Sequence, residues 1–204
     1  MNYLAHIYLS GESEKQLVGN FIGDYIKGNK YLQYDEEIAK GILLHRQIDS
    51  FTDAHSLHKE AKLYFRSDFG LYSGIVVDLI YDHFLAKNWD SYSTVRLPAF
   101  AKRVHAILLS NFTVLPRRVQ GFLPFLIQNK RLLSYASIDG IIQSLKIMGN
   151  YSSLPQKSEV ARSILIENYA EIEANFTAFF ADLSDFVIED QKVPIRKPDL
   201  TTGF

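Results

Sequence analysis

Three side chains that could bind a metal ion recur one helical turn apart around residue 45. His45, Asp49 and Asp53 stand at positions i, i+4 and i+8, so on a helix they share one stripe of its surface. One imidazole nitrogen and one carboxylate a turn apart can reach a single metal ion. The spacing alone is equally consistent with a metal site and with a surface His–Asp pair beside an exposed third acid, and both interpretations stay open.

A second pair of acids, Asp78 and Asp82, has the same spacing, and His83 directly follows it. His83 would point about 100° away from Asp82 on a helix, so it could support a metal held by either acid or face a substrate. The alternative is an acid in the first turn of a helix beside a hydrogen-bonded core histidine. It is the weaker alternative because both acids lie among apolar residues, and burial of an isolated carboxylate is very costly.

Two further candidates are weak by themselves. Asp24 lies on a face with Gly19 and Gly23, which would allow the close approach of another backbone or of a ligand. His6 lies in an apolar segment and would by itself be a core histidine. Together, three helical segments and the first segment supply acids or imidazoles, and helical bundles build metal sites from such inward side chains. The candidate metal ligands are His6, Asp24, His45, Asp49, Asp78 and Asp82.

This mixture of hard oxygen ligands and a few imidazoles suits Mn²⁺, Mg²⁺ or Fe²⁺ better than structural zinc. Such a centre can make hydroxide from bound water and neutralise a phosphoryl group, which predicts metal-assisted phosphoester hydrolysis. The sequence contains no Gly-x-Gly-x-x-Gly, P-loop or Gly-x-Ser-x-Gly motif, so dinucleotide-binding, P-loop and serine-hydrolase chemistry is disfavoured.

The segments that carry these side chains have the apolar periodicity of helices. Ser13 is the expected N-cap of the first helix, and prolines are expected to open one later helix and to interrupt the next ones. Residues 151–155 are expected to link two helices. The predicted helices are 13–27, 35–53, 56–67, 72–88, 98–110, short helices broken at Pro116 and Pro124, 138–149 and 156–188. The prediction is an all-α, single-domain helical bundle over residues 1–190, followed by an extended tail at 191–204.

Composition narrows the function further. The 204 residues are 47% hydrophobic and 22% charged, which is ordinary for a globular domain. A net charge of −1 excludes a general basic field that would hold nucleic acid or an anionic membrane. The absence of cysteine excludes thiolate nucleophiles and thiolate metal sites. With no basic, apolar leader and no long apolar run, we expect a cytoplasmic protein that binds neither nucleic acid nor membrane; its oligomeric state is unknown.

Four stretches together resemble a known family. They are Met1-Asn2-Tyr3-Leu4-Ala5-His6, Gly19-Asn20-Phe21-Ile22-Gly23-Asp24, the block from His45-Arg46-Gln47-Ile48-Asp49 to Thr52-Asp53, and Asp78-Leu79-Ile80-Tyr81-Asp82-His83-Phe84-Leu85 with Trp89. In this order and at these separations the chain resembles the bacterial acyl carrier protein (ACP) phosphodiesterases, or ACP hydrolases. The ordered set is specific although each motif alone is weak, and it covers about the first 90 residues.

The resemblance implies a Mn²⁺-dependent hydrolase with a fold like that of HD-domain phosphohydrolases, although the HD doublet is His-Asp and the order here is Asp82-His83. It implies removal of 4′-phosphopantetheine from holo-ACP to give apo-ACP, a reaction of lipid metabolism and fatty acid biosynthesis. The catalytic positions carried over are Asp24, His45, Asp49, Asp78, Asp82 and His83.

Because ACP is acidic, its hydrolase should display local positive charge. Arg46 and Arg66 neighbour the acidic motifs and are the predicted substrate-binding residues. The stretch Met148-Gly149-Asn150-Tyr151 lacks the arginines expected in the family after a methionine. The alternatives are a metal-dependent phosphohydrolase of a nucleotide or other small phosphoester, and a non-catalytic helical protein that binds an acidic partner.

Overall fold

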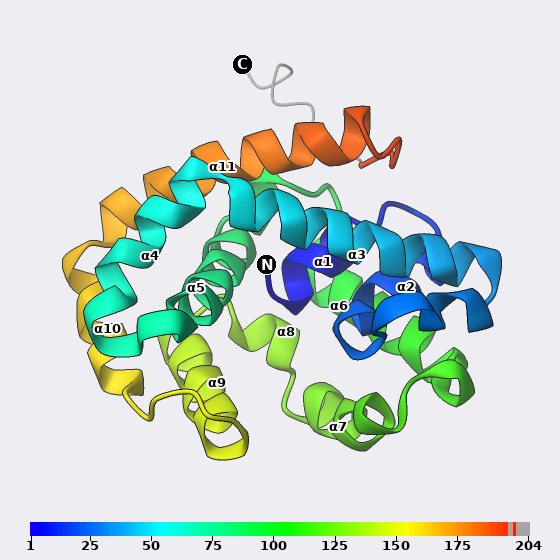
Figure 1. The fold of residues 1–204 in the computed structure, drawn as a ribbon, viewed down its shortest axis with the longest axis horizontal. Helices are drawn as coiled ribbons and strands as arrows, with labels where there is room; N and C mark the ends of the chain where they lie inside the picture. Colours follow the sequence, from blue (N-terminus) through cyan, green and yellow to red (C-terminus); the bar gives the residue numbers. More distant parts are fainter. Residues whose placement is uncertain (196–197, 199–204) are drawn as a thin grey trace.

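The helical periodicity of the sequence is realised along nearly the whole chain in the computed structural model, which describes residues 1–195 and 198 (Figure 1). These residues contain no β-strand and form one helical domain, as predicted. The helices are α1 (Tyr3–Tyr8), α2 (Glu14–Ile22), α3 (Glu36–Ala54), α4 (Ser56–Phe69), α5 (Ser73–Lys87), α6 (Leu97–Ser110), α7 (Arg117–Gln128), α8 (Arg131–Ser134), α9 (Ile138–Tyr151), α10 (Ser158–Glu167) and α11 (Tyr169–Glu189).

Local signals place the starts of the two helices that carry most of the candidate site. The Ser13 side chain accepts a hydrogen bond from the backbone of Gln16 and caps α2, as predicted. Asp35 caps α3 by accepting a hydrogen bond from the Glu37 backbone. The helix predicted over 13–27 ends earlier than expected, at Ile22, and a short 3₁₀ turn over Gly23–Tyr25 follows it.

Two further predictions about helix boundaries are wrong. Pro124 lies inside α7 and does not end it, because Val119, Leu123 and Leu126 bury an apolar face that outweighs the lost backbone hydrogen bond. The final helix predicted over 156–188 is two helices separated at Asn168. The Asn168 side chain donates to the Ile164 carbonyl and ends α10 there. The short α1 was not predicted.

Two glycines allow α2 and α3 to lie side by side at very short range (Figure 1). A Cβ atom added at Gly19 would collide with the backbone carbonyl of Ile38, and one added at Gly41 with that of Gln16. The close approach expected at Gly19 is therefore a helix–helix contact. It brings the end of α2 next to the middle of α3, where His45 and Asp49 lie.

The helix α5 runs through the centre of the molecule, and the N-terminal α1 lies beside it (Figure 1). Val77, Tyr81, Phe84 and Leu85 of α5 are fully buried, which confirms the predicted buried helix over a segment rich in β-branched residues. Among the described residues, only the stretch Ser56–Lys87 is long and apolar enough to cross a membrane, and 67% of its most apolar window is buried. That stretch consists of two packed helices, α4 and α5.

The end of α11 leads into the segment for which an extended tail is predicted. Residues 191–195 form no helix, and Val193 is buried with Gly11 beside it. The remainder of the predicted tail, 196–197 and 199–204, lies outside the described residues.

Candidate active site

Helix α1 presents His6 to the candidate site, and Asp82 fixes the start of that helix. The two carboxylate oxygens of Asp82 accept hydrogen bonds from the backbone N–H groups of Leu4 (2.8 Å) and Ala5 (3.0 Å). These N–H groups belong to the unpaired, electropositive first turn of the helix. Burial raises the pKa of Asp82 to about 7, against the opposing effect of the two N–H donors. Asp82 thus anchors α1 and does not line the pocket described below.

His6 is held in one orientation by Asn20. Its Nδ1 lies 2.9 Å from the Asn20 side-chain oxygen, while the Asn20 amide donates to the His6 carbonyl (2.7 Å) and to the Ser10 hydroxyl (3.0 Å). Because the amide nitrogen is used in this way, the oxygen must be the acceptor, and Nδ1 of His6 carries the proton. In the neutral ring, Nε2 then presents a lone pair, as a metal ligand requires.

His45 is held in the same way and by the same residue. Its Nδ1 donates to the backbone carbonyl of Asn20 at 2.8 Å. The His6 and His45 rings stack with centroids 3.9 Å apart and an angle of 16° between their planes. Asn20 therefore orients two imidazoles from two different helices, so that both Nε2 atoms face the same point.

Asp49 completes this group. Nε2 of His6 lies 3.2 Å from one Asp49 oxygen, and Nε2 of His45 lies 3.2 Å from the other. Both Nε2 atoms are buried, and neither has a partner in hydrogen-bond geometry. One ligand atom each from His6, His45 and Asp49 lies within 4.8 Å of the other two, which is close enough for one ion. Two imidazoles and a carboxylate fit a divalent transition metal.

The charges of the group follow from its burial and its contacts. Burial would lower the pKa of His45, but the carboxylates of Asp24 and Asp49 outweigh it and raise that pKa to about 9. Burial and the neighbouring His45 lower the pKa of His6 to about 4. Burial opposes the ionisation of Asp49, but the close contacts with His45 and His6 hold its pKa far below the usual range. The metal-free group is thus a protonated His45 between carboxylates, beside a neutral His6.

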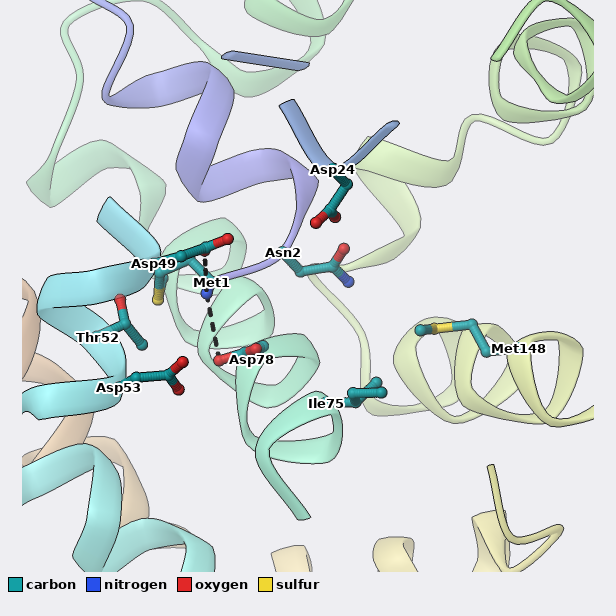
Figure 2. Close-up of a pocket in the computed structure, with 9 residues that line it drawn as sticks. All are labelled: Met1, Asn2, Asp24, Asp49, Thr52, Asp53, Ile75, Asp78 and Met148. Atoms are coloured by element: carbon teal, nitrogen blue, oxygen red, sulfur yellow. Dashed lines mark ion pairs between the residues drawn. The ribbon is translucent and has the colours of Figure 1, made fainter. Parts of the chain in front are cut away.

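A pocket of about 320 Å³ lies beside this group and is lined by its Asp49, whereas neither histidine is among the lining residues (Figure 2). Figure 2 shows the carboxylates of Asp24, Asp49, Asp53 and Asp78 around it, contributed by the turn after α2, by α3 and by α5. Four carboxylates in one pocket repel an anionic phosphodiester unless a cation is bound among them. The pocket-lining residues are Met1, Asn2, Asp24, Asp49, Thr52, Asp53, Ile75, Asp78 and Met148.

Asp78 occupies the wall of the pocket opposite α3. Its Oδ1 lies 3.0 Å from Nε2 of His58 and 3.3 Å from the Met1 amino nitrogen, which also lies 3.7 Å from Asp49. Burial opposes the ionisation of Asp78, but the Met1 amino group and His58 lower its pKa. Asp24 stands at the rim, 65% exposed, with its Oδ1 3.4 Å from Nε2 of His45.

The structure brings five of the predicted metal ligands to one place, namely His6, Asp24, His45, Asp49 and Asp78. His83 lies elsewhere: its Nδ1 is 2.8 Å from the Tyr135 carbonyl and its Nε2 is 2.8 Å from the Tyr169 hydroxyl. Burial lowers the pKa of His83. Both of its ring nitrogens are thus engaged in the core.

The two predicted substrate-binding arginines do not line the pocket. Arg46 donates to the carbonyls of Ile26 (2.9 Å) and Gly28 (2.7 Å) and stacks on the Tyr31 ring, so it braces the segment after the Asp24 turn. Arg66 is exposed on α4.

Sequence reasoning missed two residues of the site, Asn20 and His58. Asn20 is one helical turn before Asp24 and lies between apolar residues, which was a usable signal. His58 contacts an acid twenty positions later in the chain, a pairing that no local spacing encodes.

Comparison with known proteins agrees with the motifs. A family model described as "Acyl carrier protein phosphodiesterase" matches residues 1–183, well beyond the motif-bearing part. The curated acyl carrier protein phosphodiesterase of Yersinia enterocolitica is 33% identical over 88% of this chain and 94% of its own length. Those of Photorhabdus laumondii and Serratia proteamaculans are 32% and 29% identical, over 88% and 90% of this chain and 91% and 95% of their own lengths. No solved structure matches, so the likeness to HD domains stays a prediction.

Proposed function

Because the chain belongs to the acyl carrier protein phosphodiesterase family, we propose that it removes the 4′-phosphopantetheine arm from holo-ACP. Water would cleave the phosphodiester on the protein side, which leaves the ACP serine hydroxyl and free 4′-phosphopantetheine. The proposal includes a cytoplasmic location and a role in fatty acid metabolism.

One observation carries the chemical part of the proposal. Two buried Nε2 atoms from α1 and α3, each with its other ring nitrogen bonded to Asn20, converge without hydrogen-bond partners on Asp49. A hydrogen bond from the ring nitrogen that does not bind the metal orients metal-binding histidines in proteins. We propose Mn²⁺ as the ion, with Mg²⁺ or Fe²⁺ as alternatives. The ion would supply Lewis-acid chemistry, which screens the phosphate charge and activates water.

The remaining acids would then act on the substrate side of the pocket. The pKa of Asp24 is lowered, first by its contact with His45, so its carboxylate is ionised and can accept a proton from the attacking water. Asp78 is also ionised, and its contact with His58 fixes the opposite wall. Since the four acids of the pocket outnumber its cationic neighbours, the protonated His45 and the Met1 amino group, the metal-free protein should bind the phosphodiester only weakly.

Intact-mass measurement after incubation with holo-ACP and Mn²⁺ tests the proposal. A mass loss that corresponds to phosphopantetheine is expected, and it should disappear with a chelator and in Asp49→Asn. Asp190→Asn, which alters an exposed acid after α11, is the matched control and should act as the wild type does. Hydrolysis of nucleotides without any cleavage of holo-ACP would instead favour the small-phosphoester alternative. Absence of both metal binding and hydrolysis would favour a non-catalytic protein.

Docking of the acidic carrier is a separate part of the proposal. Arg66 is exposed and lies outside the pocket, so its contribution would be to association with ACP. Arg66→Glu should raise KM for holo-ACP more than for a small phosphodiester, and the effect should shrink with added salt. Arg46 is a poorer test of docking because its replacement would also release the segment that it braces.

A further inference from the structure

A second and larger pocket adjoins the metal-site pocket. It has a volume of about 710 Å³ and shares two wall residues, Asn2 and Met148, with the smaller pocket. Its other walls come largely from α7, α8 and α9, of which only α9 also lines the smaller pocket, through Met148. We call it the α7–α9 groove, and its remaining lining residues are Tyr3, Tyr25, Gly121, Phe122, Phe125, Leu126, Arg131, Tyr135, Ser144, Ile147, Asn150 and Tyr151.

The lining of the α7–α9 groove suits a mostly aliphatic ligand. Phe122, Leu126 and Ile147 line it together with Met148, and the side chains of Phe125 and Tyr151 are 41% and 88% exposed. Ligand pockets in proteins have volumes of about 300–1,000 Å³, with apolar walls and a few polar groups that fix orientation. The volume and the composition of this groove fall within that description.

Arg131 is the polar group of the groove that most clearly indicates a ligand, because it is buried and lacks an anionic partner in the part of the chain that the structure describes. Its side chain is only 6% exposed, yet no carboxylate of the described residues forms an ion pair with it. It donates to the Gly140 carbonyl (3.0 Å), to the Gln143 side-chain oxygen (3.3 Å) and to the Ser144 hydroxyl. A guanidinium has five N–H donors, so donors remain for a further oxygen. A buried cation without an anionic partner is costly unless additional acceptors reach it.

We propose that the α7–α9 groove binds the pantetheine arm of the substrate while the phosphodiester lies in the metal-site pocket. The proposal rests on the proposed function. The arm is an aliphatic chain interrupted by two amide groups, and it begins at the phosphate. A chain that leaves the metal-site pocket past Asn2 and Met148 enters the groove, where the free N–H groups of Arg131 meet the amide carbonyl oxygens.

Gly121→Trp is the main test because Gly121 lines the groove and has room for a side chain to begin there. A Cβ atom at Gly121 would meet no atom within 4 Å, so a large side chain can extend into the open space. Gln128→Trp is the control, since Gln128 is exposed at the end of the same helix and does not line the groove. Two quantities are measured on the Mn²⁺-loaded proteins: the affinity for pantetheine, which lacks the phosphate, and kcat/KM for holo-ACP relative to that for bis(p-nitrophenyl) phosphate.

We expect Gly121→Trp to weaken pantetheine binding by at least about tenfold, which is 1.4 kcal/mol, and to lower the holo-ACP ratio by a similar factor. Gln128→Trp should leave both quantities as in the wild type. Arg131→Gln should lower the same ratio, with a thermal melt to check folding, because Arg131 also bonds to α9.

The two readouts separate this proposal from the proposed function. If the wild type cleaves holo-ACP, the proposal is tested by kcat/KM for holo-ACP relative to that for bis(p-nitrophenyl) phosphate. If this ratio is unchanged in Gly121→Trp, the proposal is overturned. If the wild type does not cleave holo-ACP, the proposed function fails and the pantetheine titration decides. Binding that is lost in Gly121→Trp would then keep the groove as a pantetheine site, and the absence of such binding would overturn it.

Discussion

Replacement of Gly23 by alanine should disable the metal centre without altering any proposed ligand. The backbone of Gly23 has φ −51° and ψ −41°, which any residue can adopt, so its glycine is required only for space. A Cβ atom at this position would lie 2.7 Å from Cδ2 of His45 and closer still to Cγ and Cβ. Since ordinary contact begins at 3.4 Å, the turn at Gly23 and His45 would have to move apart, by at least 0.7 Å at Cδ2 and further at Cγ and Cβ.

That displacement decides the size of the effect on metal binding. Metal–ligand distances in proteins tolerate deviations of about 0.2 Å, so the displaced Nε2 of His45 would no longer meet the point shared with His6 and Asp49. Disturbance of the groups that orient a ligand costs about 10–100-fold in metal affinity, or about 1.4–2.7 kcal/mol. Crowding of a packed region should also lower the free energy of unfolding of the metal-free protein by about 1–3 kcal/mol.

Calorimetric titration with Mn²⁺ measures the first effect, and urea unfolding in the presence of a chelator measures the second. Gly121→Ala is the matched control: it is the same substitution within a helix, but its Cβ atom meets nothing within 4 Å. The control should keep the metal affinity of the wild type and be as stable or up to about 1 kcal/mol more stable. Wild-type Mn²⁺ affinity in Gly23→Ala would refute the assignment of His45 as a ligand.

Three further outcomes are expected. Mn²⁺ at about 100 times its Kd should raise the free energy of unfolding of the wild type by about 2.7 kcal/mol, and thermal melts should lose this gain in His6→Gln. Asp82→Asn leaves one backbone N–H at the start of α1 without an acceptor, so urea unfolding should show a loss of about 1–3 kcal/mol, with Asp190→Asn unchanged. The folded-state pKa of His83 is lowered by burial, so its contribution to stability is complete above the unfolded pKa near 6.5 and is lost as the pH falls towards the folded value. Between pH 7 and 5 the free energy of unfolding, measured with urea, should therefore fall less steeply for His83→Gln than for the wild type. The two slopes should differ by no more than about 1.4 kcal/mol per pH unit, and equal slopes would contradict the lowered pKa of His83.

The helical class and one half of the candidate metal group could be predicted from local patterns in the sequence. Apolar residues at helical spacing and the caps at Ser13 and Asp35 are local features, and local features fix where α2 and α3 begin. The i, i+4 spacing of His45 and Asp49 is also local, because one turn of a helix brings them together whatever surrounds it. For the same reason a glycine face on α2 could be recognised as a surface of close approach.

Which of the other acids and histidines lie beside that pair depends on how the helices pack against one another. Asp82 has the same spacing from Asp78 as Asp49 has from His45, yet it accepts hydrogen bonds from the start of α1 because α1 packs against α5 on that side. His6 would by itself be an ordinary core histidine, and it enters the site because Asn20 bonds to its ring while holding His45 through a backbone carbonyl. These contacts join residues far apart in the chain, so they depend on how whole helices pack, which the spacing of residues within one helix does not specify.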